Sequence, residues 1–195
     1  MRYVDEYRAP EQVLQLIDRL KTRASLLDYT KEKPLRIMEV CGGHTHAIFK
    51  FGLDQLLPEN IEFIHGPGCP VCVLPMGRID SCLDIASRPG VIFCTFGDAM
   101  RVPGKNGSLL QAKARGADVR IVYSPMDALT LAMANPERKV VFFGLGFETT
   151  MPATAITLQQ AKARNVTNFY FFCQHITLIP TLRSLLEAPD NGIDA

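Results

Sequence analysis

Residues 38–46 read Met-Glu-Val-Cys-Gly-Gly-His-Thr-His, and they end a short apolar run that begins at Leu35. A short apolar run that stops at glycine is typical of a buried parallel strand. Residues 47–57 suit a helix, so we predict that Cys41 lies where a strand passes into a helix, at the carboxyl edge of a sheet. Open α/β sheets bind ligands at that edge. Gly42 and Gly43 would let the backbone turn tightly and let a ligand approach.

The side chains around this turn are suited to a metal. A thiolate and imidazoles are ligands for iron, zinc or copper. His44 and His46 are two residues apart, so they would not share a face of a helix. We therefore take Cys41 and His44 as candidate metal ligands. The alternative is a buried structural cysteine beside a helix-capping histidine, but a second cysteine cluster downstream favours the metal interpretation.

Composition indicates a globular protein with a packed core, because 47% of the 195 residues are hydrophobic and 21% are charged. The formal net charge of +1 gives no electrostatic reason to expect nucleic acid or a membrane as a partner. No apolar run reaches the roughly 18 residues of a membrane span. The polar N-terminus lacks the apolar region of a signal peptide, so we expect a cytoplasmic location. The dinucleotide and P-loop fingerprints are incomplete.

Strand and helix patterns alternate along the chain, which predicts a parallel α/β architecture. The predicted strands are residues 35–40, 61–65, 91–96, 119–123, 140–145 and 169–173. Residues 135–138, Asn-Pro-Glu-Arg, are the best candidate for a domain boundary. We therefore expect two small parallel-sheet α/β domains facing a cleft, at residues 1–136 and 137–195. Only two strands follow this boundary, so we expect the second domain to be incomplete and the residues after Pro136 to be labile.

Polar and reactive residues gather after the predicted strands. Parallel strands end at the same edge of a sheet, so these residues would converge on one cleft. They are Cys41, His44, Cys69, Cys72, Asp98, Arg101, Glu148, Thr149 and His175.

Cys69 and Cys72 form a C-x-x-C pair in a loop rich in glycine and proline. That spacing suits a redox dithiol, or half of a zinc or iron–sulfur site. The other three cysteines, Cys82, Cys94 and Cys173, lie inside apolar segments and are predicted to be buried.

Glu148 leads the sequence Glu-Thr-Thr, for which two interpretations stay open. It could cap the helix that follows, or its carboxylate and the neighbouring hydroxyl of Thr149 could relay protons in a cleft.

Four motifs together resemble the HypD family of [NiFe] hydrogenase maturation factors. They are Cys-Gly-Gly-His-Thr-His at residues 41–46, Gly-Pro-Gly-Cys-Pro-Val-Cys at 66–72, Phe-Gly-Asp-Ala-Met-Arg-Val-Pro-Gly at 96–104 and Gly-Phe-Glu-Thr-Thr at 146–150. The resemblance implies a scaffold on which the Fe(CN)2CO unit is assembled, with a HypC-type chaperone and a HypE-type cyanide donor as partners. It implies that Cys41 binds the iron and that Cys69 and Cys72 form a thiol–disulfide centre.

We therefore assign roles to the residues of these motifs. The iron ligands are Cys41 and His44, which with Gly42, Gly43, Asp98 and Arg101 form the binding residues. The catalytic residues are Cys69, Cys72, Glu148 and Thr149. A metallocofactor assembly scaffold with redox activity fits better than a conventional turnover enzyme.

The resemblance also carries one departure and two rival hypotheses. The family's chains are about twice as long and carry a C-terminal cysteine-rich region that binds a [4Fe-4S] cluster, whose ligands we do not find in this sequence. The main alternative function is a thiol–disulfide oxidoreductase that uses Cys69 and Cys72. A third hypothesis is a structural domain that docks a partner.

Overall fold

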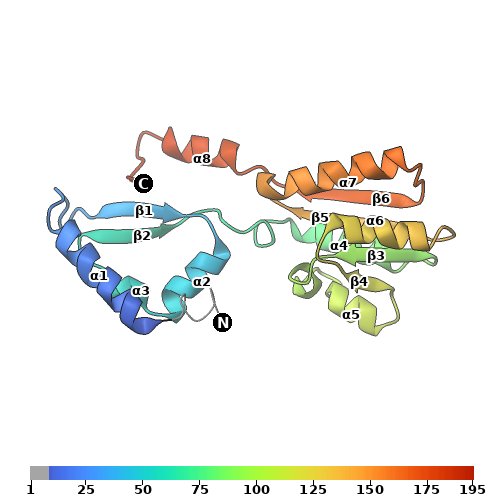
Figure 1. Cartoon of the computed structure of the whole chain (residues 1–195), viewed down its shortest axis with the longest axis horizontal. Coiled ribbons are helices and arrows are strands. Elements are labelled where there is room, and N and C mark those ends of the chain that lie inside the picture. Colours follow the sequence, from blue (N-terminus) through green and yellow to red (C-terminus); the bar gives the residue numbers. More distant parts are fainter. Residues whose placement is uncertain (1–8) are drawn as a thin grey trace. The chain divides into compact units, whose positions relative to one another are not determined.

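The structure is a computed structural model that describes residues 9–195, and these residues form two compact units. The first unit runs to Cys69 and also contains Thr181–Ala195, whereas the second comprises Pro70–Pro180 (Figure 1). The first eight residues, part of the N-terminus on which the cytoplasmic expectation rests, lie outside the described residues. Across residues 9–195, none of the helices combines the length and the apolar character needed to span a bilayer.

The first unit is built around two parallel strands, β1 (Leu35–Glu39) and β2 (Ile61–His65). Leu35 pairs with Ile61 and Glu39 pairs with His65, so the two strands end side by side. The helices of this unit are α1 (Pro10–Ala24), α2 (Gly42–Lys50), α3 (Leu53–Leu56) and most of α8 (Ile179–Leu186). Few apolar side chains of its described part are fully buried, namely Ile17, Ala24 and Ile48.

The chain returns to the first unit at its C-terminal end. The Met38 N–H donates to the carbonyl oxygen of Ala195 at 2.7 Å, and the Ala195 N–H donates to the Arg36 carbonyl oxygen at 3.1 Å. The Asp194 carboxylate accepts a further bond from the Arg36 N–H at 2.9 Å. Residues 194 and 195 therefore lie along the edge of β1 that β2 leaves open.

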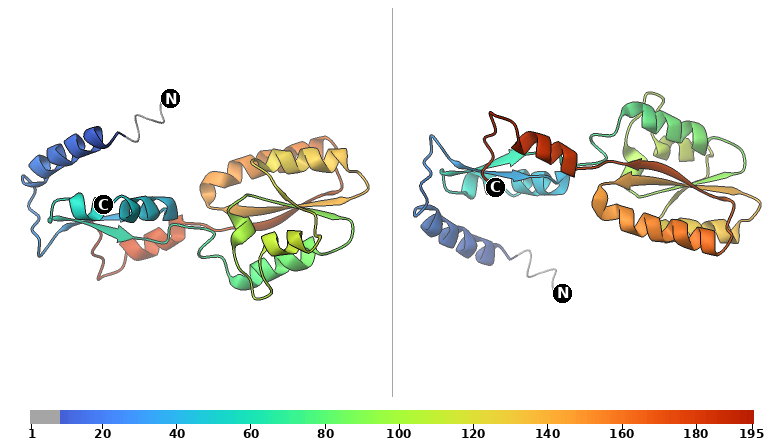
Figure 2. Two further views of the ribbon diagram at one scale, coloured as in Figure 1. Left: turned by 90° about the horizontal axis from the view of Figure 1, so that it is seen from below. Right: turned by 90° about the horizontal axis from the view of Figure 1, so that it is seen from above.

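The second unit is a parallel sheet between two layers of helices. The strand order is β4-β3-β5-β6, and the strands are β3 (Val91–Thr95), β4 (Val119–Ile121), β5 (Lys139–Gly146) and β6 (Phe169–His175). One face carries α4 (Met76–Ala86) and α5 (Leu109–Ala114), and the other carries α6 (Pro125–Ala134) and α7 (Met151–Ala163) (Figure 2). The predicted α/β fold class with two parallel sheets is confirmed.

The loop between α6 and β5, which we predicted to be a domain boundary, is tied into the sheet. The Asn168 side-chain amide lies 2.9 Å from the carbonyl oxygens of Ala132, Asn135 and Arg138. The Arg138 guanidinium donates to the Val91 carbonyl oxygen at 3.0 Å. The loop has the composition of a linker, but these hydrogen bonds fix it between its neighbours.

Strands from both sides of the predicted boundary share one sheet, because β5 pairs with β3. Phe142 and Phe143 of β5 are fully buried. The boundary placed at residues 136 and 137 is therefore wrong, and so is the picture of an uncovered two-stranded piece after Pro136. The two units instead divide between residues 69 and 70 and between residues 180 and 181.

We expect the backbone amides of β3 and β5 to exchange with solvent more slowly than those of β1 and β2. The two central strands are buried on both faces, whereas β1 and β2 are only partly buried. Peptide-level hydrogen exchange measures this directly. Phe143→Ala should accelerate exchange in β3 and β5, since it removes a buried ring at a cost of about 3–5 kcal/mol. Leu16→Ala, at an exposed position, is the control. Equal protection of all four strands would contradict the unequal cores.

Candidate functional site

Cys41 lies where the sequence predicted, between a parallel strand and a helix. It follows β1 after one residue and is the N-cap of α2, with an extended backbone at φ −142° and ψ 117°. Its side chain makes no capping hydrogen bond. The helix begins at Gly42 rather than at the predicted position 47, and Gly52, in the left-handed region at φ +60°, separates it from α3.

The loop after β2 packs directly against this turn. A Cβ atom at Gly68 would lie 2.0 Å from the Val40 carbonyl carbon and 2.3 Å from the Cys41 nitrogen, so the backbones could not approach as they do if residue 68 had a side chain. A Cβ at Gly42 would lie 3.8 Å from the Cys69 Sγ, and one at Gly43 would lie 3.6 Å from the Cys41 Sγ. The thiols of Cys41 and Cys69 therefore both border the first turn of α2.

Gly42 and Gly43 do not form the tight turn that the sequence predicted. The glycines with positive φ among the described residues are Gly52, Gly90, Gly107 and Gly116, so neither Gly42 nor Gly43 makes a tight turn. Both begin a regular helix and are exposed. A side chain at Gly42 would contact Cys69, and one at Gly43 would contact the Cys41 thiol.

A partly buried carboxylate, which the sequence motifs do not include, joins the residues at this edge. The Glu39 side chain is 10% exposed and accepts hydrogen bonds from the Cys41 N–H at 2.9 Å and from the Thr45 hydroxyl. Its Oε1 also lies 2.7 Å from the His65 Nδ1. Burial acts to raise the pKa of the Glu39 carboxyl, but the hydrogen bonds from Thr45, His65 and Cys41 outweigh it and hold the pKa below its ordinary value.

His44 and His46 are exposed on the first turns of α2. Within residues 9–195, no group of three or more His, Cys, Asp or Glu side chains is arranged to hold a metal ion. The described part of the first unit therefore brings fewer than three such donors together at any point, and His44 stays a predicted ligand. The same donor set does not fit a [4Fe-4S] cluster, which needs four cysteine ligands.

The remaining predicted residues lie at the carboxyl edge of the second unit's sheet. The chain leaves β3 for β4 through α5 on one face and enters β5 through α6 on the other, so a topological switch point lies between β3 and β5. Asp98 and Arg101 follow β3 at the 3-10 turn η2 (Ala99–Arg101), and Glu148 and Thr149 follow β5 at η3 (Glu148–Thr150). Four of the predicted residues thus flank the position where such sheets bind ligands.

Thr95 and Asp98, both near this switch point, differ in whether their side-chain oxygens have hydrogen-bond partners. The hydroxyl of Thr95, the last residue of β3, is buried and has no hydrogen-bond partner among the described residues. The Asp98 carboxylate accepts from the Ala99 N–H at 2.8 Å and so caps η2. The unsatisfied Thr95 hydroxyl marks a polar position in an otherwise apolar core.

Glu148 is a helix cap, but not of the helix that follows it. Its carboxylate accepts from the Leu178 N–H at 2.8 and 3.0 Å and from the Ile179 N–H at 3.3 Å, at the start of α8. These bonds, chiefly the one from Leu178, lower the pKa of Glu148. The carboxylate thereby fixes the residues just before the chain passes from the second unit to the first. Thr149 is exposed.

The six cysteines fall into three environments. Cys82 and Cys94 are fully buried as predicted, and burial raises the pKa of each thiol to about 12. Cys41 and Cys69 are partly buried, whereas Cys72 is exposed and lies near the start of the second unit, which begins at Pro70. The prediction for Cys173 is wrong, because it is exposed near the end of the edge strand β6, with its Sγ 3.8 Å from the His175 Nδ1.

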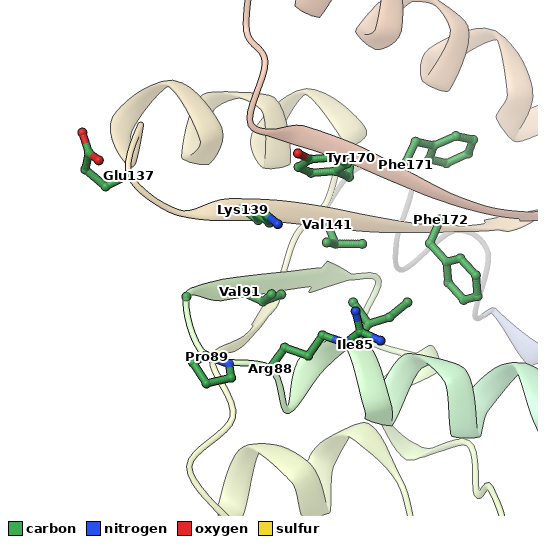
Figure 3. A pocket seen from close by; sticks show the side chains of 11 residues that line it. Ile85, Arg88, Pro89, Val91, Glu137, Lys139, Val141, Tyr170, Phe171 and Phe172 are labelled. Carbon is green, nitrogen blue, oxygen red and sulfur yellow. The ribbon is translucent and has the colours of Figure 1, made fainter.

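The cavity drawn in Figure 3 is not the candidate site. It has a volume of about 500 Å³ and lies where β3 and β5 begin, beside Val91 and Lys139. Tyr170 and Phe172 of β6 and Ile85 of α4 complete its apolar wall. None of the predicted site residues lines it, and those that follow β3 and β5 lie at the opposite ends of these strands.

Comparison with known proteins agrees with the motifs. The family model described as "HypD: Hydrogenase formation hypA family" matches residues 11–195. The chain belongs to the HypD family. It is 87% identical over 195 residues to the hydrogenase maturation factor HypD of Escherichia coli and 58% identical over 194 residues to that of Rhodobacter capsulatus.

These relatives are longer than the chain. The matches cover 100% of the chain but 52% of each of those two HypD proteins. The HypD2 protein of Bradyrhizobium diazoefficiens is 52% identical over 191 residues, which are 97% of the chain and 49% of the relative. The chain thus spans about half the length of the curated HypD relatives it matches.

We expect thiol labelling of the native chain to separate the buried from the exposed cysteines. Iodoacetamide at neutral pH should modify Cys173 and leave Cys82 and Cys94 unmodified until the chain is denatured, because the thiolate is the reactive form. Mass mapping of the labelled peptides shows which cysteines react in the native chain and which react only after denaturation. Rapid native labelling of Cys82 or Cys94 would contradict the buried environments.

We expect Glu148→Ala to accelerate amide exchange at residues 178 and 179, because those N–H groups lose their acceptor. Glu187→Ala, an exposed position beyond α8, is the matched control. The folded pKa of Glu148 is lowered, so its contribution is complete above the usual carboxyl pKa of about 4.3 and is lost as the pH falls through the folded value. Unchanged exchange in Glu148→Ala at neutral pH would show that the carboxylate does not hold α8.

Proposed function

We propose that this chain acts in [NiFe] hydrogenase maturation as a scaffold that holds iron through the Cys41 thiolate while the Fe(CN)2CO unit is assembled. The observation that carries the proposal is the position of Cys41. It is the N-cap residue of a helix at a sheet edge, and its thiol makes no capping hydrogen bond. Curated relatives named hydrogenase maturation factor HypD support the process.

The donor set suits this cargo. An iron that carries cyanide and CO already has several strong ligands, so it needs few from the protein. One or two thiolates in an open turn can hold such an iron and release it later, whereas a closed cage of four donors would retain it. Exposed His44 is a further proposed ligand, and Gly42 and Gly43 leave space for the bound group. We propose that a HypC-type chaperone supplies another ligand and that a HypE-type protein supplies cyanide, in the cytoplasm.

Cys69 and Cys72 are the proposed thiol–disulfide centre. Cys69 borders the same helical turn as Cys41, which places one thiol of the pair next to the proposed iron ligand. For Asp98, Arg101 and Thr149 we propose a binding role at the switch point of the second unit. For Glu148 the observed contacts support a positioning role.

The alternative function is a thiol–disulfide oxidoreductase centred on Cys69 and Cys72, which the exposure of Cys72 favours. This alternative needs no iron. It predicts that a disulfide substrate is reduced at the same rate by the wild-type chain and by Cys41→Ala.

The test is anaerobic co-purification of the chain with a HypC-type chaperone, followed by metal analysis and infrared spectroscopy. We expect bound iron and the stretching bands of CN and CO in the wild-type complex, and the loss of both in Cys41→Ala. Cys173→Ala, which removes a different exposed thiol, is the control and should keep both. Full iron loading and unchanged bands in Cys41→Ala would refute the proposal.

A further inference from the structure

The carboxylate of Glu39 joins three segments of the first unit at one point. It ends β1, and its partners are the Cys41 N–H at the start of α2, the Thr45 hydroxyl one turn further along α2, and the His65 ring at the end of β2. The side chain is 10% exposed. A partly buried carboxylate with both oxygens bonded is held in place, because moving it would break several hydrogen bonds to a charged group at once.

Glu39 accepts the N–H of the N-cap residue of α2, which is the donor that the carboxylate of a capping box normally takes. The first N–H groups of a helix lack partners within it, and a negative charge near them is favourable. Here the N-cap residue is Cys41, whose thiol makes no capping bond. The carboxylate of Glu39, two residues earlier, accepts from the Cys41 N–H instead. The Cys41 thiol therefore takes no part in capping the helix.

His65 connects the same network to the start of the loop that carries the second thiol. Its ring lies against Glu39 on one side, and its centroid is 5.0 Å from that of Phe49 in α2. The loop that carries Gly68 and Cys69 begins directly after His65. A carboxylate that holds His65 therefore also fixes where this loop starts, and the loop's backbone packs on Cys41.

We propose that Glu39 is the positioning residue that sets the Cys41 thiol against the Cys69 thiol. The role of this thiol pair in iron handling rests on the function proposed above, but the geometric claim does not. Glu39 touches neither iron nor a substrate. It acts through the Cys41 backbone, Thr45 and His65.

The test measures how easily the two thiols are bridged. Dibromobimane joins two nearby thiols and becomes fluorescent only when both react. In a Cys72→Ser background, so that Cys69 cannot pair with Cys72, we expect rapid bridging of Cys41 to Cys69. Glu39→Ala should be bridged about tenfold more slowly, as expected when hydrogen bonds to a charged group are lost. Mass mapping identifies the bridged peptides.

Two further variants separate positioning from general destabilisation. Glu39→Gln should bridge at nearly the wild-type rate, because its amide oxygen can accept from the Cys41 N–H while its NH2 group donates to the Thr45 oxygen or the His65 ring. Thr45→Val, which removes one partner and keeps a helical residue, should give an intermediate rate. Glu62→Ala on β2, an exposed carboxylate paired with Arg36, is the control and should not change the rate.

The bridging rates test the positioning role of Glu39 separately from the iron binding that the co-purification tests. An unchanged bridging rate in Glu39→Ala, or a Gln variant as slow as the Ala variant, would overturn the positioning role. If Glu39→Ala is too unstable to purify, the bridging rate of Thr45→Val is compared with that of the wild-type chain. Equal bridging rates would overturn the positioning role of Glu39. Slow bridging in Glu39→Ala together with a wild-type complex that binds no iron would uphold the positioning role and refute only the iron scaffold.

Discussion

The parallel pairing of β1 with β2 is the constraint on which the candidate site depends. Because the strands run in the same direction and in register, Glu39 and His65 end side by side and both following loops leave the same edge. An antiparallel pair would send those loops to opposite ends. The glycine at position 68 then lets the second loop lie against the backbone of Cys41. Two thiols that are 28 residues apart in the sequence thereby border one helical turn.

One of the two points at which the chain passes between the units lies inside a family motif, and a motif residue binds the backbone just before the other. The first crossing lies between Cys69 and Pro70, inside the C-x-x-C motif. The second lies just after Leu178 and Ile179, whose N–H groups are held by Glu148. Glu148, a catalytic candidate in the sequence, therefore has a structural role in the folded chain.

The two glutamates, Glu39 and Glu148, illustrate how a carboxylate can serve a site without reacting in it. Each accepts at least one backbone N–H at the start of a helix. The pKa of Glu39 is lowered against the effect of burial chiefly by the bonds from Thr45 and His65, and the pKa of Glu148 chiefly by the bond from the Leu178 N–H. The sequence identifies only Glu148 as a candidate site residue, because it lies in a polar motif. Glu39 lies in an apolar strand pattern, where a single acidic residue resembles an exposed position of the strand.

The sequence by itself determined the parallel α/β class, the strand that ends before Cys41, and the burial of Cys82 and Cys94, because hydrophobic periodicity and glycine placement are local signals. It could not assign strands to sheets. The loop after α6 has a linker's composition, yet the Asn168 amide and Arg138 tie it into a four-stranded sheet. Cys173 was misjudged because an apolar pattern does not reveal that β6 is an edge strand. Strand order, the approach of Gly68 to Cys41 and the partners of both glutamates were decided by the tertiary structure, since they join residues that only folding brings together.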